Sequence, residues 1–115
     1  PHGECGVLAP GKALGVNESV TSCDGRFTLI QQDDGNLVLY MNGVGALWAT
    51  VTDKTAATAR IMQEDGNLVV YTGEGKPLWD SHTWGNDGAW LAVQDDGNLV
   101  IYSSKAIWAS GTDGY

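Results

Sequence analysis

Apolar and polar residues alternate over short stretches of the chain, and glycine or aspartate interrupts the alternation every few residues. An alternation of period two places successive side chains on opposite faces of a β-strand, so the pattern predicts strands rather than helices. Residues 36–40, with the sequence NLVLY, are rich in strand formers, and Asp34-Gly35 just before them is a tight-turn signal. We therefore expect residues 27–32 and 36–40 to pair as a hairpin.

The same pattern occurs three times. The segments QQDDGNLVLY, MQEDGNLVVY and VQDDGNLVIY begin at residues 31, 62 and 93, which gives a spacing of 31 in both intervals (62 − 31 and 93 − 62). Each unit continues with a tryptophan, in ALWAT, PLWDS and AIWAS. A fixed period indicates a repeat architecture. We expect a single all-β domain spanning residues 1–115.

Alternation within each unit predicts two different faces. The leucine side of each central strand is assigned to the core, and it comprises Leu37, Leu39, Leu68, Val70, Leu99 and Ile101. Trp48, Trp79 and Trp108 are expected to fill the centre, where three sheets converge. The opposite face carries the Asn, Val and Tyr of each unit and is expected to look outward. A repeated polar face of this kind indicates binding.

Composition excludes several classes of function. The chain has 115 residues, the size of one domain, and 14 acidic against 6 basic residues. This acidic balance disfavours nucleic acid and anionic membrane surfaces as partners. No apolar run reaches the roughly 20 residues needed to cross a bilayer. We expect no nucleic-acid binding and no membrane insertion.

The two cysteines, Cys5 and Cys23, both precede the first repeat. A structural zinc site needs four ligands, so we expect a disulfide instead. Closing a loop of about 18 residues would stabilise the fold by roughly 3 kcal/mol. Disulfides persist in oxidising compartments, which predicts a secreted, extracellular protein.

The three segments fit the pattern Q-x-D-x-N-x-V-x-Y, which resembles the sugar-binding motif of the monocot mannose-binding lectins, also called bulb-type or snowdrop-type lectins. The resemblance extends over nearly the whole chain. It implies a β-prism II fold, with three four-stranded antiparallel sheets around a pseudo-threefold axis. It also implies binding of mannose or mannose-rich glycans by up to three pockets, without a metal or other cofactor. The carbohydrate-binding residues would be Gln32, Asp34, Asn36, Val38 and Tyr40; Gln63, Asp65, Asn67, Val69 and Tyr71; and Gln94, Asp96, Asn98, Val100 and Tyr102.

These residue types suit a monosaccharide. A carboxylate only accepts hydrogen bonds, a carboxamide both donates and accepts, and valine offers an apolar floor for ring carbons. The resemblance implies that Asp and Asn hold O2 of mannose, Gln binds near O3 and Tyr binds O4. A ligand of about 12 heavy atoms at about 0.3 kcal/mol each would bind with a dissociation constant of about 1 mM. Useful affinity would require several pockets to engage at once.

Other interpretations of the repeat stay open. Asp-Gly-Asn is a common turn and Leu-Val-Leu-Tyr a common strand, so the repeat could be a structural or interaction module that binds no sugar. The same pockets could also serve a toxin or bacteriocin targeting module for bacterial surface sugars, such as a rhamnose polysaccharide. The acidic turns invite a calcium site, but they lack the spacing of known calcium loops, so we expect no metal.

We expect no enzymatic activity. The stretch WDSHTW places Asp80, Ser81 and His82 side by side, and adjacent residues cannot converge on one atom as a triad does. The repeated aspartates occupy three equivalent positions, which fits three binding sites better than the single acid–base pair of a glycosidase.

Three features fall outside the repeat or depart from it. Asp80 stands where the other units have Ala49 and Ala109, which puts the packing of the second unit in doubt. Trp84 and Trp90 lie outside the repeat; Trp84 is expected to be exposed, and Trp90 to face outward, extending the third pocket or covering a subunit contact. Only 13 residues follow Tyr102 (115 − 102), so the last strand must complete a sheet begun by the N-terminus. The resemblance implies that this strand, near residues 107–110, is exchanged with a partner to form a homodimer.

Overall fold

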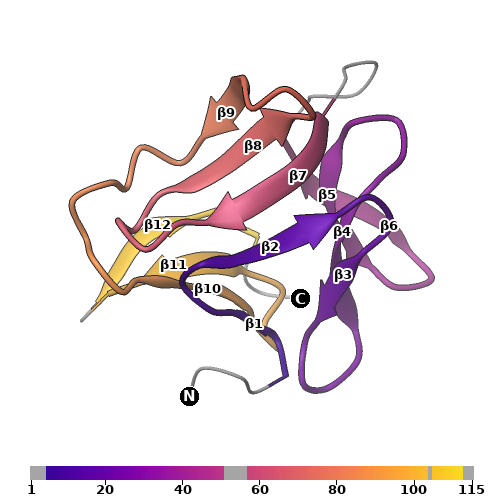
Figure 1. Cartoon of the computed structure of the whole chain (residues 1–115). Coiled ribbons are helices and arrows are strands. Elements are labelled where there is room, and N and C mark those ends of the chain that lie inside the picture. Colours follow the sequence, from indigo (N-terminus) through magenta and orange to yellow (C-terminus); the bar gives the residue numbers. More distant parts are fainter. Residues whose placement is uncertain (1–4, 51–56, 104, 113–115) are drawn as a thin grey trace.

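The computed structural model describes residues 5–50, 57–103 and 105–112, without the side chains of residues 57–60. The described residues form twelve strands, which confirms the all-β prediction (Figure 1). These are β1 (Val7–Leu8), β2 (Lys12–Gly15), β3 (Ser19–Thr21), β4 (Phe27–Gln31), β5 (Leu37–Met41), β6 (Gly45–Ala49), β7 (Ala57–Met62), β8 (Leu68–Thr72), β9 (Pro77–Asp80), β10 (Trp90–Val93), β11 (Leu99–Tyr102) and β12 (Ala106–Ala109).

The strands form three four-stranded antiparallel sheets around a common interior (Figure 1). Each repeat supplies three consecutive strands, and the N-terminal segment supplies the fourth strand of every sheet. The orders are β3-β4-β5-β6, β2-β7-β8-β9 and β1-β10-β11-β12. The first and last strands, β1 and β12, therefore lie in the same sheet, as expected for a terminal strand that completes a sheet begun by the N-terminus.

The predicted hairpins are present, with strand ends that differ by one residue. In the first unit, Gln32 N donates to the Asn36 carbonyl at 2.9 Å, and Gly35 N donates to the Gln32 carbonyl at 3.2 Å. The same two backbone bonds recur at Gln63 and Gln94. The turn glycines have φ between 90° and 94°, a left-handed conformation that favours glycine over any residue with a Cβ. This requirement explains why glycine recurs in every copy.

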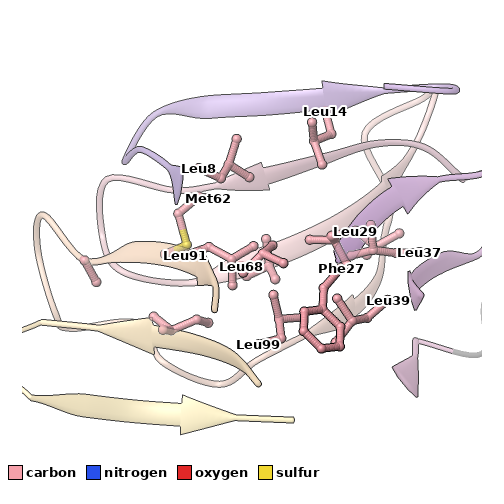
Figure 2. Packing of buried hydrophobic residues seen from close by; sticks show 14 residues of the cluster. Leu8, Leu14, Phe27, Leu29, Leu37, Leu39, Met62, Leu68, Leu91 and Leu99 are labelled. Carbon is pink, nitrogen blue, oxygen red and sulfur yellow. The ribbon is translucent and has the colours of Figure 1, made fainter. Parts of the chain in front are cut away.

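Buried aliphatic side chains from all three sheets meet in the interior (Figure 2). The core-facing residues predicted from alternation are all fully buried: Leu37, Leu39, Leu68, Val70, Leu99 and Ile101. Phe27, Leu29, Met62 and Leu91 join them from the neighbouring strands. Because each sheet contributes equivalent positions, three repeats that could not bury their apolar faces alone share one core.

A one-residue bulge recurs in the last strand of every sheet. In the first sheet Leu39 lies opposite Trp48 and Tyr40 lies opposite Ala46, so Leu47 is the additional residue. A bulge breaks strict alternation, and Leu47 and Trp48, although adjacent in sequence, both pack against the core. The pairs Leu78-Trp79 and Ile107-Trp108 repeat this arrangement.

The three repeated tryptophans meet, as predicted. Their ring centroids lie 5.3 to 5.9 Å apart with interplanar angles of 73° to 79°, so each pair packs edge to face. They do not fill the innermost positions, however. Trp48, Trp79 and Trp108 lie on the outermost strands of their sheets and are half-buried, while leucines and Phe27 occupy the centre.

The N-terminal segment is fastened to the rest of the molecule. Cys5 and Cys23 form the predicted disulfide, with an S–S distance of 2.08 Å. Val93 N donates to the carbonyl of Gly6 at 2.7 Å, which links this segment to the third sheet. The Arg26 side chain, which lies 2.8 Å from the Asp24 carboxylate, holds the pKa of Asp24 well below its usual range.

Candidate functional site

The predicted residues of each motif lie on one hairpin, and in the second unit all of them except Asp65 line one hollow. In the second unit, Gln63, Asn67, Val69 and Tyr71 line a hollow of about 320 Å³. This face points away from the core, as predicted, but its central side chains are not exposed to solvent. The central valines Val38, Val69 and Val100 are only 3%, 4% and 2% exposed. They lie outside the central core cluster, and Val69 lines the hollow of the second site, so we assign the valines to the floor of the sites.

Gln and Tyr of each motif are hydrogen-bonded to each other across the hairpin. Gln63 Nε2 donates to the Tyr71 hydroxyl, and Gln94 Nε2 donates to the Tyr102 hydroxyl. In the first unit, the Gln32 amide is oriented so that its oxygen accepts from the Tyr40 hydroxyl. A carboxamide has two N–H donors and one acceptor oxygen, so one bond to tyrosine uses only part of its capacity.

The motif aspartates shape the turn that carries them. A carboxylate oxygen of Asp34 accepts from the backbone N–H of Asn36 at 2.9 Å, and the same bond measures 3.0 Å in the second unit and 2.9 Å in the third. This side chain-to-backbone bond is typical of aspartate in turns. An ionised carboxylate has about four acceptor positions, so the turn does not use up its capacity to bind a hydroxyl. All three aspartates, Asp34, Asp65 and Asp96, are exposed.

A hydroxyl holds the oxygen of each motif asparagine. Thr50 Oγ1 donates to Asn36 Oδ1 at 3.3 Å, and Ser81 Oγ and Ser110 Oγ donate to the corresponding oxygens of Asn67 and Asn98 at 3.1 Å. With its oxygen turned to the hydroxyl, each amide presents its NH₂ group on the other side.

Sequence reasoning missed these three hydroxyl residues. Each lies two positions after the repeated tryptophan, in WAT, WDS and WAS, so the signal was present in the repeat.

The second site differs from the other two at Asp80. Asp80 lies opposite Val69, whereas Ala49 and Ala109 lie opposite the equivalent valines. The Asp80 carboxylate accepts from Asn67 Nδ2 at 2.9 Å and lines the hollow of the second site. Asp80 therefore lies beside the motif, on the outer face of the sheet. Because Trp79 points inward, the next residue on the strand points outward, away from the core.

The side chains of Ser81 and His82, which follow Asp80, have different partners. His82 Nδ1 lies 3.1 Å from Asp80, whereas the Ser81 hydroxyl donates to Asn67 and lies 2.7 Å from the Thr83 hydroxyl. Asp80, Ser81 and His82 therefore do not form one chain of hydrogen bonds, because Ser81 bonds to Asn67 and Thr83 while His82 contacts Asp80.

The third site is flanked by an aromatic pair. Trp90 lies opposite Tyr102 on the neighbouring strand, and their rings stack with centroids 5.8 Å apart at 26°. Trp90 therefore lies on the motif face, as alternation predicted. Whether it extends the third pocket or covers a subunit contact stays a prediction. Trp84 is 68% exposed, also as predicted.

A second hollow, of about 550 Å³, adjoins the turn of the second motif and is lined by Pro10, Glu64, Asp65, Asp87 and Gly88. Within residues 5–50, 57–103 and 105–112, no three His, Cys, Asp or Glu side chains are grouped so that they could hold a metal ion. Over the same part of the chain, no helix has the length and hydropathy of a membrane span.

Three solved structures similar to this chain are lectins. A Marasmius oreades lectin is 30% identical, with 96% of this chain and 93% of that chain covered and a TM-score of 0.87. A monomeric monocot mannose-binding lectin from Gastrodia elata is 44% identical over 93% and 97% of the two chains, with a TM-score of 0.83. The mannose-specific agglutinin of snowdrop (Galanthus nivalis) bulbs, in complex with methyl α-D-mannoside, is 40% identical over 93% and 96%, with a TM-score of 0.79.

The chain belongs to the monocot mannose-binding lectin family. Its three four-stranded sheets are those of the β-prism II fold of bulb-type lectins, as the sequence resemblance implied. No family model and no curated protein sequence matched the chain.

Proposed function

We propose that the protein is a secreted, non-enzymatic lectin that binds mannose or mannose-rich glycans through up to three pockets, one on each sheet. The observation that carries this proposal is the threefold recurrence of one polar arrangement. In every unit, glutamine is paired with tyrosine, aspartate with the backbone of the turn, and asparagine with a hydroxyl. The names of the relatives support mannose as the sugar. The Cys5–Cys23 disulfide supports an extracellular location.

Each pocket would hold a sugar by complementary donors and acceptors. In the third site, the Ser110 hydroxyl orients the Asn98 amide so that its NH₂ donates to a sugar hydroxyl, while Asp96 accepts from it. Gln94 and Tyr102 would bind neighbouring hydroxyls, and Val100 would contact the ring carbons. The equivalent residues of the other two sites would have the same roles. No metal and no cofactor takes part in this scheme.

Multiple sites would compensate for weak individual binding. A monosaccharide bound with a dissociation constant of about 1 mM is held too weakly for stable attachment to a cell surface. Pockets on three different sheets could engage several branches or several glycans, which raises the overall affinity without any new contact.

Titration calorimetry with methyl α-D-mannoside tests the proposal. We expect a dissociation constant of about 1 mM, and loss of the heat when Asn36, Asn67 and Asn98 are all replaced by alanine. Asn42→Ala is the matched control, because Asn42 lies in the turn after β5 and bonds to the Gly25 carbonyl, outside the motif. Absence of heat from the unmodified protein at millimolar sugar would instead favour a structural or interaction module.

A glycan array separates the lectin proposal from the targeting-module alternative. Mannose recognition predicts that ligands with terminal mannose dominate. Dominance of rhamnose-containing bacterial polysaccharides would favour the toxin or bacteriocin module.

A homodimer formed by exchange of the C-terminal strand is part of the proposal. Strand β12 is paired with β11 on one side and forms the edge of its sheet, so it is the strand that a second copy could replace. Light scattering at working concentration should give twice the mass of one chain. A mass equal to that of one chain would remove strand exchange while leaving sugar binding intact.

A further inference from the structure

The three motif sites differ in the charge at one equivalent position. On the strand beside the motif, Asp80 occupies the place that Ala49 and Ala109 take in the other two sheets. The motif residues themselves are identical in type in all three sites. The second site therefore combines an unchanged sugar-binding motif with one additional carboxylate.

Asp80 lies beside the motif asparagine of the second site and lines the same hollow. Its Oδ2 accepts from Asn67 Nδ2 at 2.9 Å, and its side chain is only 28% exposed. The Asn67 oxygen is held from the other side by Ser81 Oγ at 3.1 Å and Thr83 N at 3.2 Å. The amide is therefore fixed with its NH₂ group toward the carboxylate, and a ligand that reaches Asn67 also approaches Asp80.

Three further carboxylates lie near the turn of the second motif. Glu64, Asp65 and Asp87 line the neighbouring hollow, and Asp65 belongs to the motif itself. His82 contacts Asp80 at 3.1 Å, but its side chain is 83% exposed, so solvent screens any compensation it supplies.

We propose that Asp80 makes the second site selective for charge: it favours a saccharide that carries an ammonium group and disfavours one that carries a carboxylate, relative to a neutral mannoside. This inference rests on the proposed function, because it concerns the ligand of one of the three proposed pockets. The protein would then combine two sites for neutral mannosides with one site suited to an amino-bearing glycan.

The expected selectivity follows from the position of the carboxylate. A carboxylate that only accepts hydrogen bonds finds a charged donor in an ammonium group and a like charge in a uronate. For a carboxylate that is partly accessible to solvent, this attraction or repulsion corresponds to about a fivefold change in dissociation constant. Added salt should weaken the effect, because the charges remain partly accessible to solvent.

The test uses three ligands with the same ring hydroxyls at C2, C3 and C4. These are methyl α-D-mannoside, its 6-amino-6-deoxy analogue and the corresponding methyl mannosiduronate. Titrations of ¹⁵N-labelled protein are followed by NMR through the side-chain amides of Asn36, Asn67 and Asn98, so that each site reports its own dissociation constant. We expect about a fivefold preference for the amino ligand over the neutral one at Asn67 and less than about twofold at the other two sites. The uronate should show the reverse order at Asn67.

Two substitutions assign the effect to one residue. Asp80→Asn keeps the size of the side chain and its acceptor oxygen but removes its charge, so the preference at Asn67 should fall to that of the other sites. Ala49→Asp places a carboxylate at the equivalent position of the first sheet and should create the preference at Asn36. Urea denaturation checks that both variants are folded. If Ala49→Asp is not folded, the result for Asp80→Asn is sufficient to test the inference.

Equal charge dependence at all three sites, or a preference that survives in Asp80→Asn, would overturn the inference while leaving mannose binding in place. If methyl α-D-mannoside shifts none of the three amides, the proposed function itself fails and the inference fails with it.

Discussion

Individual motif residues combine a role in folding with a role in the site. Asp34 closes the turn through the backbone N–H of Asn36, and Gly35 adopts the positive φ that the turn requires. Repetition of aspartate and glycine is therefore explained by the hairpin alone. Repetition of glutamine and tyrosine is not, because their bond lies on the outer face and does not form the turn. The interpretation as a binding site depends on these residues.

The turn glycine of the second motif gives a prediction at this scale. In Gly66→Ala, the new Cβ would clash with the Asn86 carbonyl and lie 2.8 Å from its carbon, in a residue with φ of +94°. We expect a loss of about 3 kcal/mol in the free energy of unfolding, measured by urea denaturation.

Gly43→Ala is the control for this substitution. Gly43 also has a positive φ, of +79°, but no atom lies within 4 Å of the place that a Cβ would take. This variant should lose only about 1 kcal/mol, from backbone conformation alone. Equal losses in the two variants would contradict the steric argument.

At the scale of the element, a bulge changes what a strand can bury. Strict alternation on β6 would place Leu47 and Trp48 on opposite faces, and the additional residue allows both to pack inward. The same irregularity in β9 and β12 brings the three tryptophans together at the outer strands of the sheets. The last strands of the three sheets thus contact one another through the edges and faces of these aromatic rings.

Removal of one tryptophan tests this contact. Trp108→Ala deletes edge-to-face contacts with Trp48 and Trp79, at centroid distances of 5.3 and 5.9 Å. We expect the free energy of unfolding to fall by about 3 kcal/mol, at the lower end for an aromatic truncation because the ring is half-buried. Trp84→Ala, at a residue 68% exposed, should change it by less than about 0.5 kcal/mol. Similar denaturation midpoints for the two variants would argue against a stabilising cluster.

In the whole molecule, one N-terminal segment joins all three sheets. Strands β1, β2 and β3 belong to three different sheets, so the repeats are not independent units that stack in order. Strand β1 has only two residues, Val7 and Leu8, and the disulfide anchors the chain immediately before it. Asp24 N also donates to Asp95 at 3.0 Å, which ties the segment to the turn of the third motif.

Loss of the disulfide should therefore weaken the whole fold. Replacing Cys5 and Cys23 by serine should lower the free energy of unfolding by about 3 kcal/mol, because the unfolded chain regains the freedom of an 18-residue loop. Reductant should lower the stability of the unmodified protein by a similar amount and leave the double variant unchanged. A protein whose denaturation midpoint does not respond to reductant would show that the bridge adds nothing to stability.

The sequence by itself determined the hairpins, the core-facing residues and the motif sets, because these depend on neighbours along the chain. Alternation assigned Leu37 and Leu39 to the interior, and the glycine turn placed Asn36 directly before the strand that carries Tyr40. Tertiary structure alone decided which distant segments meet. It placed Thr50, Ser81 and Ser110 against the motif asparagines and set Asp80 beside Asn67. These contacts come from pairing between strands, and the bulges shift that pairing by one residue, so alternation along a single strand does not reveal them.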